Sequence, residues 1–183
     1  MRDRATESKQ GKTTAIFARA RSLLSTVVVG LVLLSAGKYC LAGRLLINYT
    51  PSIPRGVYWI SHGEVPRRGE LVAFPIPDSV RQLLHERRYV PASVQLLAKP
   101  VVAVGGDYVC IRDEGLVING ELAGKVVPFD AEGRSLPRAN VCRYLAWDEI
   151  FTGTTHDNSF DSRYFGPVPL EKVRGSLTPL LSF

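Results

Sequence analysis

The sequence is poor in the side chains that most often carry nucleophilic and metal chemistry. Its 183 residues include three histidines and three cysteines. His62 precedes a glycine in a turn, His85 lies among charged residues, and His156 alone is near other candidate active-site residues. These positions argue against a serine-histidine mechanism. We predict neither a metal site nor a cofactor.

The sequence also lacks a marked excess of charge outside its N-terminus. The formal net charge is +6. Through Arg21 there are six basic and two acidic side chains, so this tail contributes +4 and the remaining residues about +2. A nucleic-acid-binding surface needs a concentration of positive charge on the folded domain. We therefore predict no nucleic acid partner.

One long hydrophobic run is present, and it is short for a membrane span. Ser22 to Gly37 contains sixteen uncharged residues, which as a helix would reach roughly 24 Å against a hydrocarbon core of ~30 Å. If the Lys38 side chain extends to the membrane surface, the apolar stretch continues to Ala42 and becomes long enough. Two alternatives are a buried helix in a soluble core and a cleaved secretory signal.

We interpret residues 22–42 as an uncleaved transmembrane signal anchor, because no clear cleavage site follows it. Basic residues precede the anchor and few follow it, which predicts a cytoplasmic tail at residues 1–21. Residues 43–183 would then form a single catalytic domain in the bacterial periplasm, attached to the inner membrane. Cys110 and Cys142 would lie in that oxidising compartment, where they can form one disulfide. Two buried free thiols remain the alternative.

The pattern of the body predicts a mainly β domain with antiparallel sheets. Short stretches rich in β-branched and aromatic residues recur between glycine and proline turn signals. Asn119-Gly120 suits a tight hairpin turn. One helix is expected at Ser79 to Arg88, capped by Asp78, and Ala131 to Asn140 is expected to be an exposed loop. The predicted strands are VYWIS, ELVAFP, SVQLLAKPVVAV, DYVCIR, GLVING, EIFTGT and EKVRGSLTPLL.

Ser52 is a candidate nucleophile in the segment NYTPSIPRGVY. Pro51 and Pro54 exclude a helix and restrict the backbone, so we expect a rigid, extended segment that presents the serine. A serine in a proline-rich linker close to the membrane is the alternative.

Lys99 is a candidate general base in the otherwise apolar run LAKPVVAVGGD. Apolar neighbours would lower its pKa from about 10.4 toward neutrality, so that a free amine could accept a proton. A serine hydrolase without a histidine base needs such a group. Alternatively, the lysine protects an edge strand from pairing.

A third segment, GTTHDNSFDSRYFGP, is rich in hydroxyls and charges. Asp161 and Arg163 can pair, and Ser159 and Ser162 can hydrogen-bond a neutral lysine or the aspartate. A solvated loop is the alternative.

These three segments, in this order, resemble the signal peptidase I family, peptidase S26, and most of all its conjugative-transfer, TraF-type branch. The matching motifs are Ser52-Ile53-Pro54, Lys99 followed by Gly106-Asp107, and the stretch DNSFDSRYFG from Asp157 to Gly166. The similarity runs from about Asn48 to about Leu180. It implies the signal peptidase (S26/LexA-like) antiparallel β fold with one N-terminal transmembrane helix.

The resemblance also implies roles for individual residues. Ser52 would be the nucleophile and Lys99 the general base. Thr50 would offer its hydroxyl, and Ser52 its backbone N–H, to the oxyanion. Ser159 would orient the Lys99 amine, and Asp161 and Arg163 would form a supporting ion pair.

The sequence departs from general leader peptidases at positions outside the predicted dyad. Ala103 and Gly105 stand where those enzymes usually have Gly and Pro, and Thr154-Thr155 where they have Asp-Asn. With the compact chain, these changes favour the conjugation branch. The implied substrate is a pilin or another membrane-bound precursor, cleaved or possibly cyclised for a conjugative secretion apparatus.

Three other functions stay open at this point. A general signal peptidase would process many secreted precursors. A self-cleaving repressor of the LexA type shares the serine-lysine chemistry but needs a DNA-binding domain where this sequence has its hydrophobic run. A non-enzymatic, membrane-anchored binding module would keep the fold and tolerate loss of Ser52.

Overall fold

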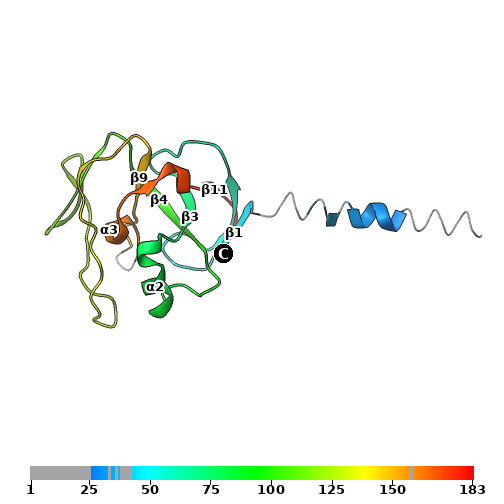
Figure 1. Cartoon of the computed structure of the whole chain (residues 1–183), viewed down its shortest axis with the longest axis horizontal. Coiled ribbons are helices and arrows are strands. Elements are labelled where there is room, and N and C mark those ends of the chain that lie inside the picture. The colour runs from blue at the N-terminus through cyan, green and yellow to red at the C-terminus, as the bar shows by residue number, and fades with distance from the viewer. Residues whose placement is uncertain (1–25, 33, 36, 38–42, 157–158) are drawn as a thin grey trace, which may run out of the picture. The chain divides into compact units, whose positions relative to one another are not determined.

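The structure is a computed structural model that describes residues 26–32, 34–35, 37, 43–156 and 159–183 (Figure 1). The chain divides into two compact units, Met1–Gly43 and Arg44–Phe183. In the first unit, residues 26–32, 34–35 and 37 are helical. Among the described residues no helix has the length and apolar character needed to cross a membrane. The predicted tail, 1–21, and much of the predicted anchor, 22–42, lie outside the described residues.

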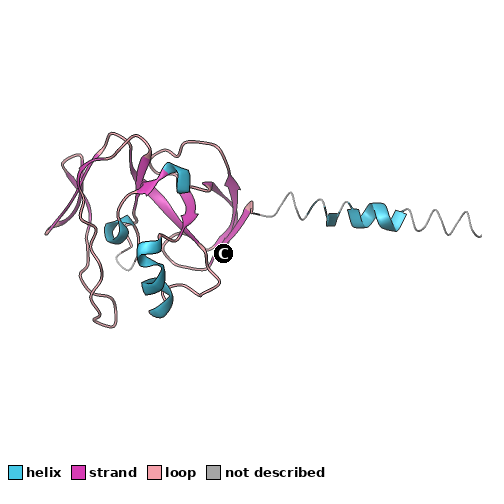
Figure 2. Cartoon of the chain, viewed as in Figure 1, coloured by secondary structure: helices cyan, strands magenta, loops and turns pink. Residues whose placement is uncertain are grey.

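The second unit is mainly β, as the β-branched and aromatic stretches predict, with short helices beside the strands (Figure 2). Its larger sheet has seven antiparallel strands in the order β1-β2-β11-β3-β4-β9-β10. The strands are β1 Leu45–Asn48, β2 Gly56–Ser61, β3 Leu71–Pro75, β4 Leu96–Val104, β9 Glu149–Thr152, β10 Val168–Pro169 and β11 Gly175–Ser182. Segments from both ends of this unit therefore meet in one sheet.

The smaller sheet has four antiparallel strands in the order β7-β6-β5-β8. Its strands are β5 Tyr108–Arg112, β6 Gly115–Ile118, β7 Glu121–Gly124 and β8 Cys142–Tyr144. The predicted turn at Asn119-Gly120 connects β6 to β7, and both residues have positive φ, at 51° and 91°. Asparagine and glycine tolerate this conformation better than other residues, so the turn prediction is confirmed.

Strand β4 has buried and partly exposed residues in strict alternation, and Lys99 is on its buried face. Leu97, Val101 and Ala103 are buried on the same face. β4 pairs with β3 on one side and β9 on the other. Lys99 therefore does not protect an edge strand from pairing, and that interpretation is wrong, because this strand is central.

The predicted helix is present as α2, Asp78–Glu86, and its buried residues Val80 and Leu84 pack into the hydrophobic core. The predicted cap is wrong. The N-cap is Pro77, and Asp78 lies in the first turn, where it accepts hydrogen bonds from Arg81. The predicted loop from Ala131 to Asn140 is confirmed. Two further short helices are α3, Ser162–Phe165, and the 3-10 turn Leu170–Lys172.

Candidate active site

The candidate nucleophile Ser52 lies in the connection between β1 and β2. Pro51 and Ser52 form a tight turn and Ile53 a bend, so the expected extended segment is wrong. Two contacts hold the turn: the Ile53 side chain is 5% exposed in the core, and the Tyr58 hydroxyl donates to the Pro54 carbonyl at 2.6 Å. The segment is nevertheless fixed in place, as the prolines predicted.

The Ser52 hydroxyl lies 3.3 Å from Thr50 Oγ1. Thr50 in turn bonds the side chain of Asn48, a buried polar residue at the end of β1. Sequence reasoning did not identify Asn48. The signal that could have found it is a short polar side chain that ends an apolar strand directly before a turn, a position that favours local side-chain to backbone bonds.

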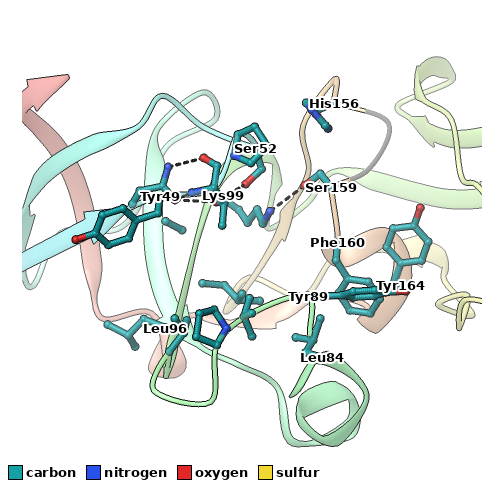
Figure 3. A pocket seen from close by; sticks show the side chains of 18 of the residues that line it. Tyr49, Ser52, Leu84, Tyr89, Leu96, Lys99, His156, Ser159, Phe160 and Tyr164 are labelled. Atoms are coloured by element: carbon teal, nitrogen blue, oxygen red, sulfur yellow. Dashed lines mark hydrogen bonds between the residues drawn. The ribbon is translucent and has the colours of Figure 1, made fainter. Parts of the chain in front are cut away.

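The candidate base Lys99 is 6% exposed. Its amine donates a hydrogen bond to Ser159 Oγ at 2.9 Å (Figure 3). Burial lowers the pKa of Lys99 from 10.5 to about 8, with nearby Asp161 opposing that shift and Arg163 adding to it. A substantial fraction of Lys99 is then a neutral amine slightly above neutral pH, which is the form that can accept a proton.

Asp161 and Arg163 form a buried, two-pronged ion pair. The guanidinium donates to the carboxylate at 2.7 and 2.8 Å, and the two side chains are 0% and 2% exposed. Arg163 also donates to the carbonyls of Lys125 and Ser159. Asp161 accepts from the Arg163 amide as the N-cap of α3. The alternative interpretation of this segment as a solvated loop is therefore wrong. Internal hydrogen bonds hold the buried segment, and it positions Ser159 against Lys99. Asp157 and Asn158 of the same motif lie outside the described residues.

Ser52 and Lys99 line one cavity of about 710 Å³. Its walls are mostly apolar, and Ser159, Phe160 and Tyr164 lie on the side that faces the Lys99 amine (Figure 3). In the described part of the chain no hydrogen bond joins Ser52 Oγ to Lys99 Nζ. Contacts of this kind often tighten only when substrate binds. A hydroxyl and a desolvated amine thus line the same, largely apolar cavity.

A second cavity, of about 1060 Å³, lies next to the first, and Pro51, Ser52 and His156 line both. His156 is thus the one histidine near the site, as predicted. His62 lies elsewhere and contacts the Arg174 carbonyl. His85 lines neither cavity, and it is half-buried.

Cys110 and Cys142 lie opposite each other on the paired strands β5 and β8. Their Cα atoms are 3.8 Å apart and the structure joins them by a disulfide. Among the described residues no group of His, Cys, Asp and Glu side chains could hold a metal ion.

Comparison with known proteins shows where the chain belongs. Residues 19–181 match the family described as signal peptidase, peptidase S26. A plasmid transfer protein TraF of Escherichia coli is 34% identical over 163 residues, which are 84% of this chain and 92% of that protein. A conjugal transfer protein TraF of Agrobacterium fabrum is 32% identical over 166 residues, 85% and 93% of the two chains. A signal peptidase I from Enterococcus faecalis aligns in structure with 24% identity and a TM-score of 0.39, covering 63% of this chain and 98% of that one.

Proposed function

Because the chain belongs to the signal peptidase family, peptidase S26, we propose that it is a membrane-anchored serine endopeptidase with Ser52 as nucleophile and Lys99 as general base. The observation that carries this proposal is the buried Lys99. Its amine bonds Ser159, has a pKa lowered to about 8, and shares an apolar cavity with Ser52. Burying a lysine costs stability, so a lysine kept in such a place indicates a functional role.

In the proposed reaction the neutral Lys99 amine takes the proton of Ser52 as Oγ attacks the scissile carbonyl. A bond forms between Oγ and the carbonyl carbon, and the protonated amine then gives the proton to the leaving nitrogen as the peptide bond breaks. Ser159 keeps the amine in place, and the Asp161–Arg163 pair holds Ser159 in turn. The Ser52 backbone N–H and the Thr50 hydroxyl would stabilise the oxyanion.

The proposed substrate is a membrane-bound precursor, a conjugative pilin, whose apolar segment occupies the cavity. The names of the relatives support this assignment, because they describe plasmid and conjugal transfer proteins. Attack on the acyl-enzyme by water would cleave the precursor, whereas attack by the substrate's own N-terminal amine would cyclise it. We propose the inner membrane as location, with residues 43–183 in the periplasm beside a conjugative secretion apparatus.

The test is processing of the candidate pilin precursor in cells that express each variant at matched levels. Ser52→Ala should lower processing at least about 1,000-fold, the scale on which loss of a catalytic nucleophile acts. Lys99→Arg should be equally inactive, because a guanidinium keeps the charge but cannot act as a base in a protein. The Lys172→Arg variant, at an exposed lysine, is the matched control and should process normally.

Near wild-type processing by Ser52→Ala or by Lys99→Arg would refute the mechanism. Processing of many secreted precursors rather than one would favour a general signal peptidase. A phenotype that depends on the folded chain but survives Ser52→Ala would favour an anchored binding module.

A further inference from the structure

The buried side chain of Asn48 connects the candidate nucleophile's turn to the end of β1. Asn48 is 6% exposed. Its Nδ2 lies 2.8 Å from the carbonyl oxygen of Thr50 and 3.1 Å from those of Ile53 and Pro54. Its Oδ1 lies 3.2 Å from the Thr50 amide and 2.7 Å from Thr50 Oγ1. One amide group thus contacts backbone atoms on both sides of Ser52.

The chemistry of these partners determines which way the amide faces. Carbonyl oxygens can only accept, so the atom that meets three of them must be the NH₂ group. The Thr50 backbone amide can only donate, so the atom that meets it must be the oxygen. The orientation of Asn48 therefore follows from its surroundings.

This orientation sets the direction of the Thr50 proton. Asn48 Oδ1 has no proton to give, so at 2.7 Å Thr50 must donate its single hydroxyl proton to it. In the contact between Thr50 and Ser52, Thr50 Oγ1 is then the acceptor and Ser52 Oγ the donor. In the free enzyme Thr50 consequently holds the Ser52 oxygen, and the Ser52 proton must turn from Thr50 to Lys99 before attack. Thr50 can donate to an oxyanion only after it leaves Asn48.

Resting on the proposed function, we propose that Asn48 is a positioning residue for the serine nucleophile. Its NH₂ group fixes the turn that carries Ser52, and its oxygen makes Thr50 an acceptor that holds Ser52 Oγ in place until the Ser52 proton turns to Lys99. A nucleophile whose reacting atom is held in place reacts faster than one that moves freely, and small misplacements can cost about 100-fold in rate.

The experiment measures Ser52-dependent hydrolysis of p-nitrophenyl acetate by the purified full-length chain in detergent, with the rate of Ser52→Ala subtracted. Asn48→Ala should lower kcat about 100-fold with little change in KM, because orientation and not binding is lost. The pH midpoint of the activity should not change, since Asn48 does not contact Lys99. Asn48→Asp should lose as much, because its second oxygen would face three carbonyls without a proton.

Thr50→Val and Thr50→Ser separate the two parts of the role at an exposed position, where folding is not at risk. Valine removes the hydroxyl both as acceptor from Ser52 and as oxyanion donor, and should lower kcat about 10-fold or more, whereas serine keeps the hydroxyl and should retain activity. Asn119→Gly is the matched control. Asn119 also accepts from a backbone amide, that of Tyr108, and donates to Asp107, but it lines neither cavity.

If the Asn48→Ala variant folds and its kcat falls no further than that of Asn119→Gly, the proposal is overturned. A shifted pH midpoint would also overturn it, because general collapse of the site around Lys99 would then explain the loss. Equal activity of Thr50→Val and Thr50→Ser would contradict the role of the Thr50 hydroxyl as acceptor toward Ser52. If wild type itself shows no Ser52-dependent hydrolysis, the proposed enzyme function fails, and the role of Asn48 fails with it.

Discussion

At the scale of single residues, Lys99 combines a functional need with a cost in stability. The side chain lies on the buried face of a central strand, where its charged form is poorly solvated. A lysine that keeps an ordinary pKa would be protonated at neutral pH and useless as a base. The burial that lowers the pKa of Lys99 to about 8 therefore makes the residue reactive and costs folding energy at the same time.

The first prediction concerns the pH dependence of activity. Ser52-dependent turnover should rise with pH through a midpoint near 8, because the Lys99 amine must lose its proton before it can act as base. The measurement is the initial rate of ester or peptide hydrolysis from pH 6 to pH 10. A rate independent of pH across this range would show that Lys99 is not the titrating base.

A second prediction concerns the stability of Lys99→Met. Between pH 8 and pH 10.5 the unfolded wild type binds more protons at residue 99 than the folded one, so its free energy of unfolding should rise with pH in that window. Below it, the burial of the ammonium costs about 3 kcal/mol. At pH 7 the methionine variant should be more stable by up to about this amount and inactive.

Chemical denaturation at pH 7 and pH 10 measures the effect of Lys99→Met. The matched variant Lys172→Met, at an exposed lysine, should leave stability and its pH dependence unchanged. A lower stability of Lys99→Met at pH 7 would contradict the assigned cost of burial.

At the scale of elements, the loop between β7 and β8 forms one wall of the cavity that contains Ser52 and Lys99. Val127, Phe129 and Leu136 line the cavity from this loop. Asp130 holds the loop in place, because it accepts hydrogen bonds from the Tyr89 hydroxyl and the Arg134 side chain. Although desolvation favours its neutral form, these hydrogen bonds hold the pKa of the Asp130 carboxyl well below its usual range. The loop is exposed but anchored.

The third prediction is that Asp130→Asn loosens this wall. The loss of the carboxylate weakens the contacts to Arg87 and Arg134, so trypsin should cut after Arg134 faster than in wild type. Since the folded pKa of Asp130 is depressed, wild type should hold the loop above about pH 4 and release it as the pH falls further. Asp113→Asn, at a fully exposed aspartate, is the control. Equal cleavage rates in both variants would contradict the role of Asp130.

At the scale of the whole molecule, the disulfide joins two strands that are distant in sequence. Cys110 and Cys142 are 32 residues apart, and a bridge over such a loop contributes about 3 kcal/mol in the chain-entropy model. We predict that Cys110→Ser with Cys142→Ser lowers the denaturation midpoint and that Cys40→Ser does not. Mass analysis without reductant provides the direct measurement. Two free thiols in protein taken from the periplasmic face of the membrane would end this prediction.

The fifth prediction is the topology of the chain, with the N-terminus inside and residues 43–183 outside. It follows from the +4 charge of the first 21 residues ahead of the uncharged run. Alkaline phosphatase fused after Phe183 should be active, and a cytoplasmic reporter at the same point should be silent. The opposite pattern would exclude a periplasmic catalytic domain.

Local patterns in the sequence predicted much of the fold. Stretches rich in β-branched and aromatic residues between turn signals identified β2 to β6, β9 and β11. The same reasoning missed β1, β7, β8 and β10, which are at most four residues long. Strands β6 and β9 are equally short but contain more β-branched residues, so composition and not length separates the two groups.

The sequence by itself determined the chemistry of the candidate site: a serine between prolines, a lysine in an apolar strand, and the DNSFDSRYFG motif. Only the tertiary structure decided how these parts meet. It brought Ser159 to Lys99 across 60 residues, made β4 a central strand, and turned Asn48 toward Thr50. The Lys99–Ser159 contact and the central place of β4 depend on how distant segments close on one another, and local side-chain patterns do not encode that closure.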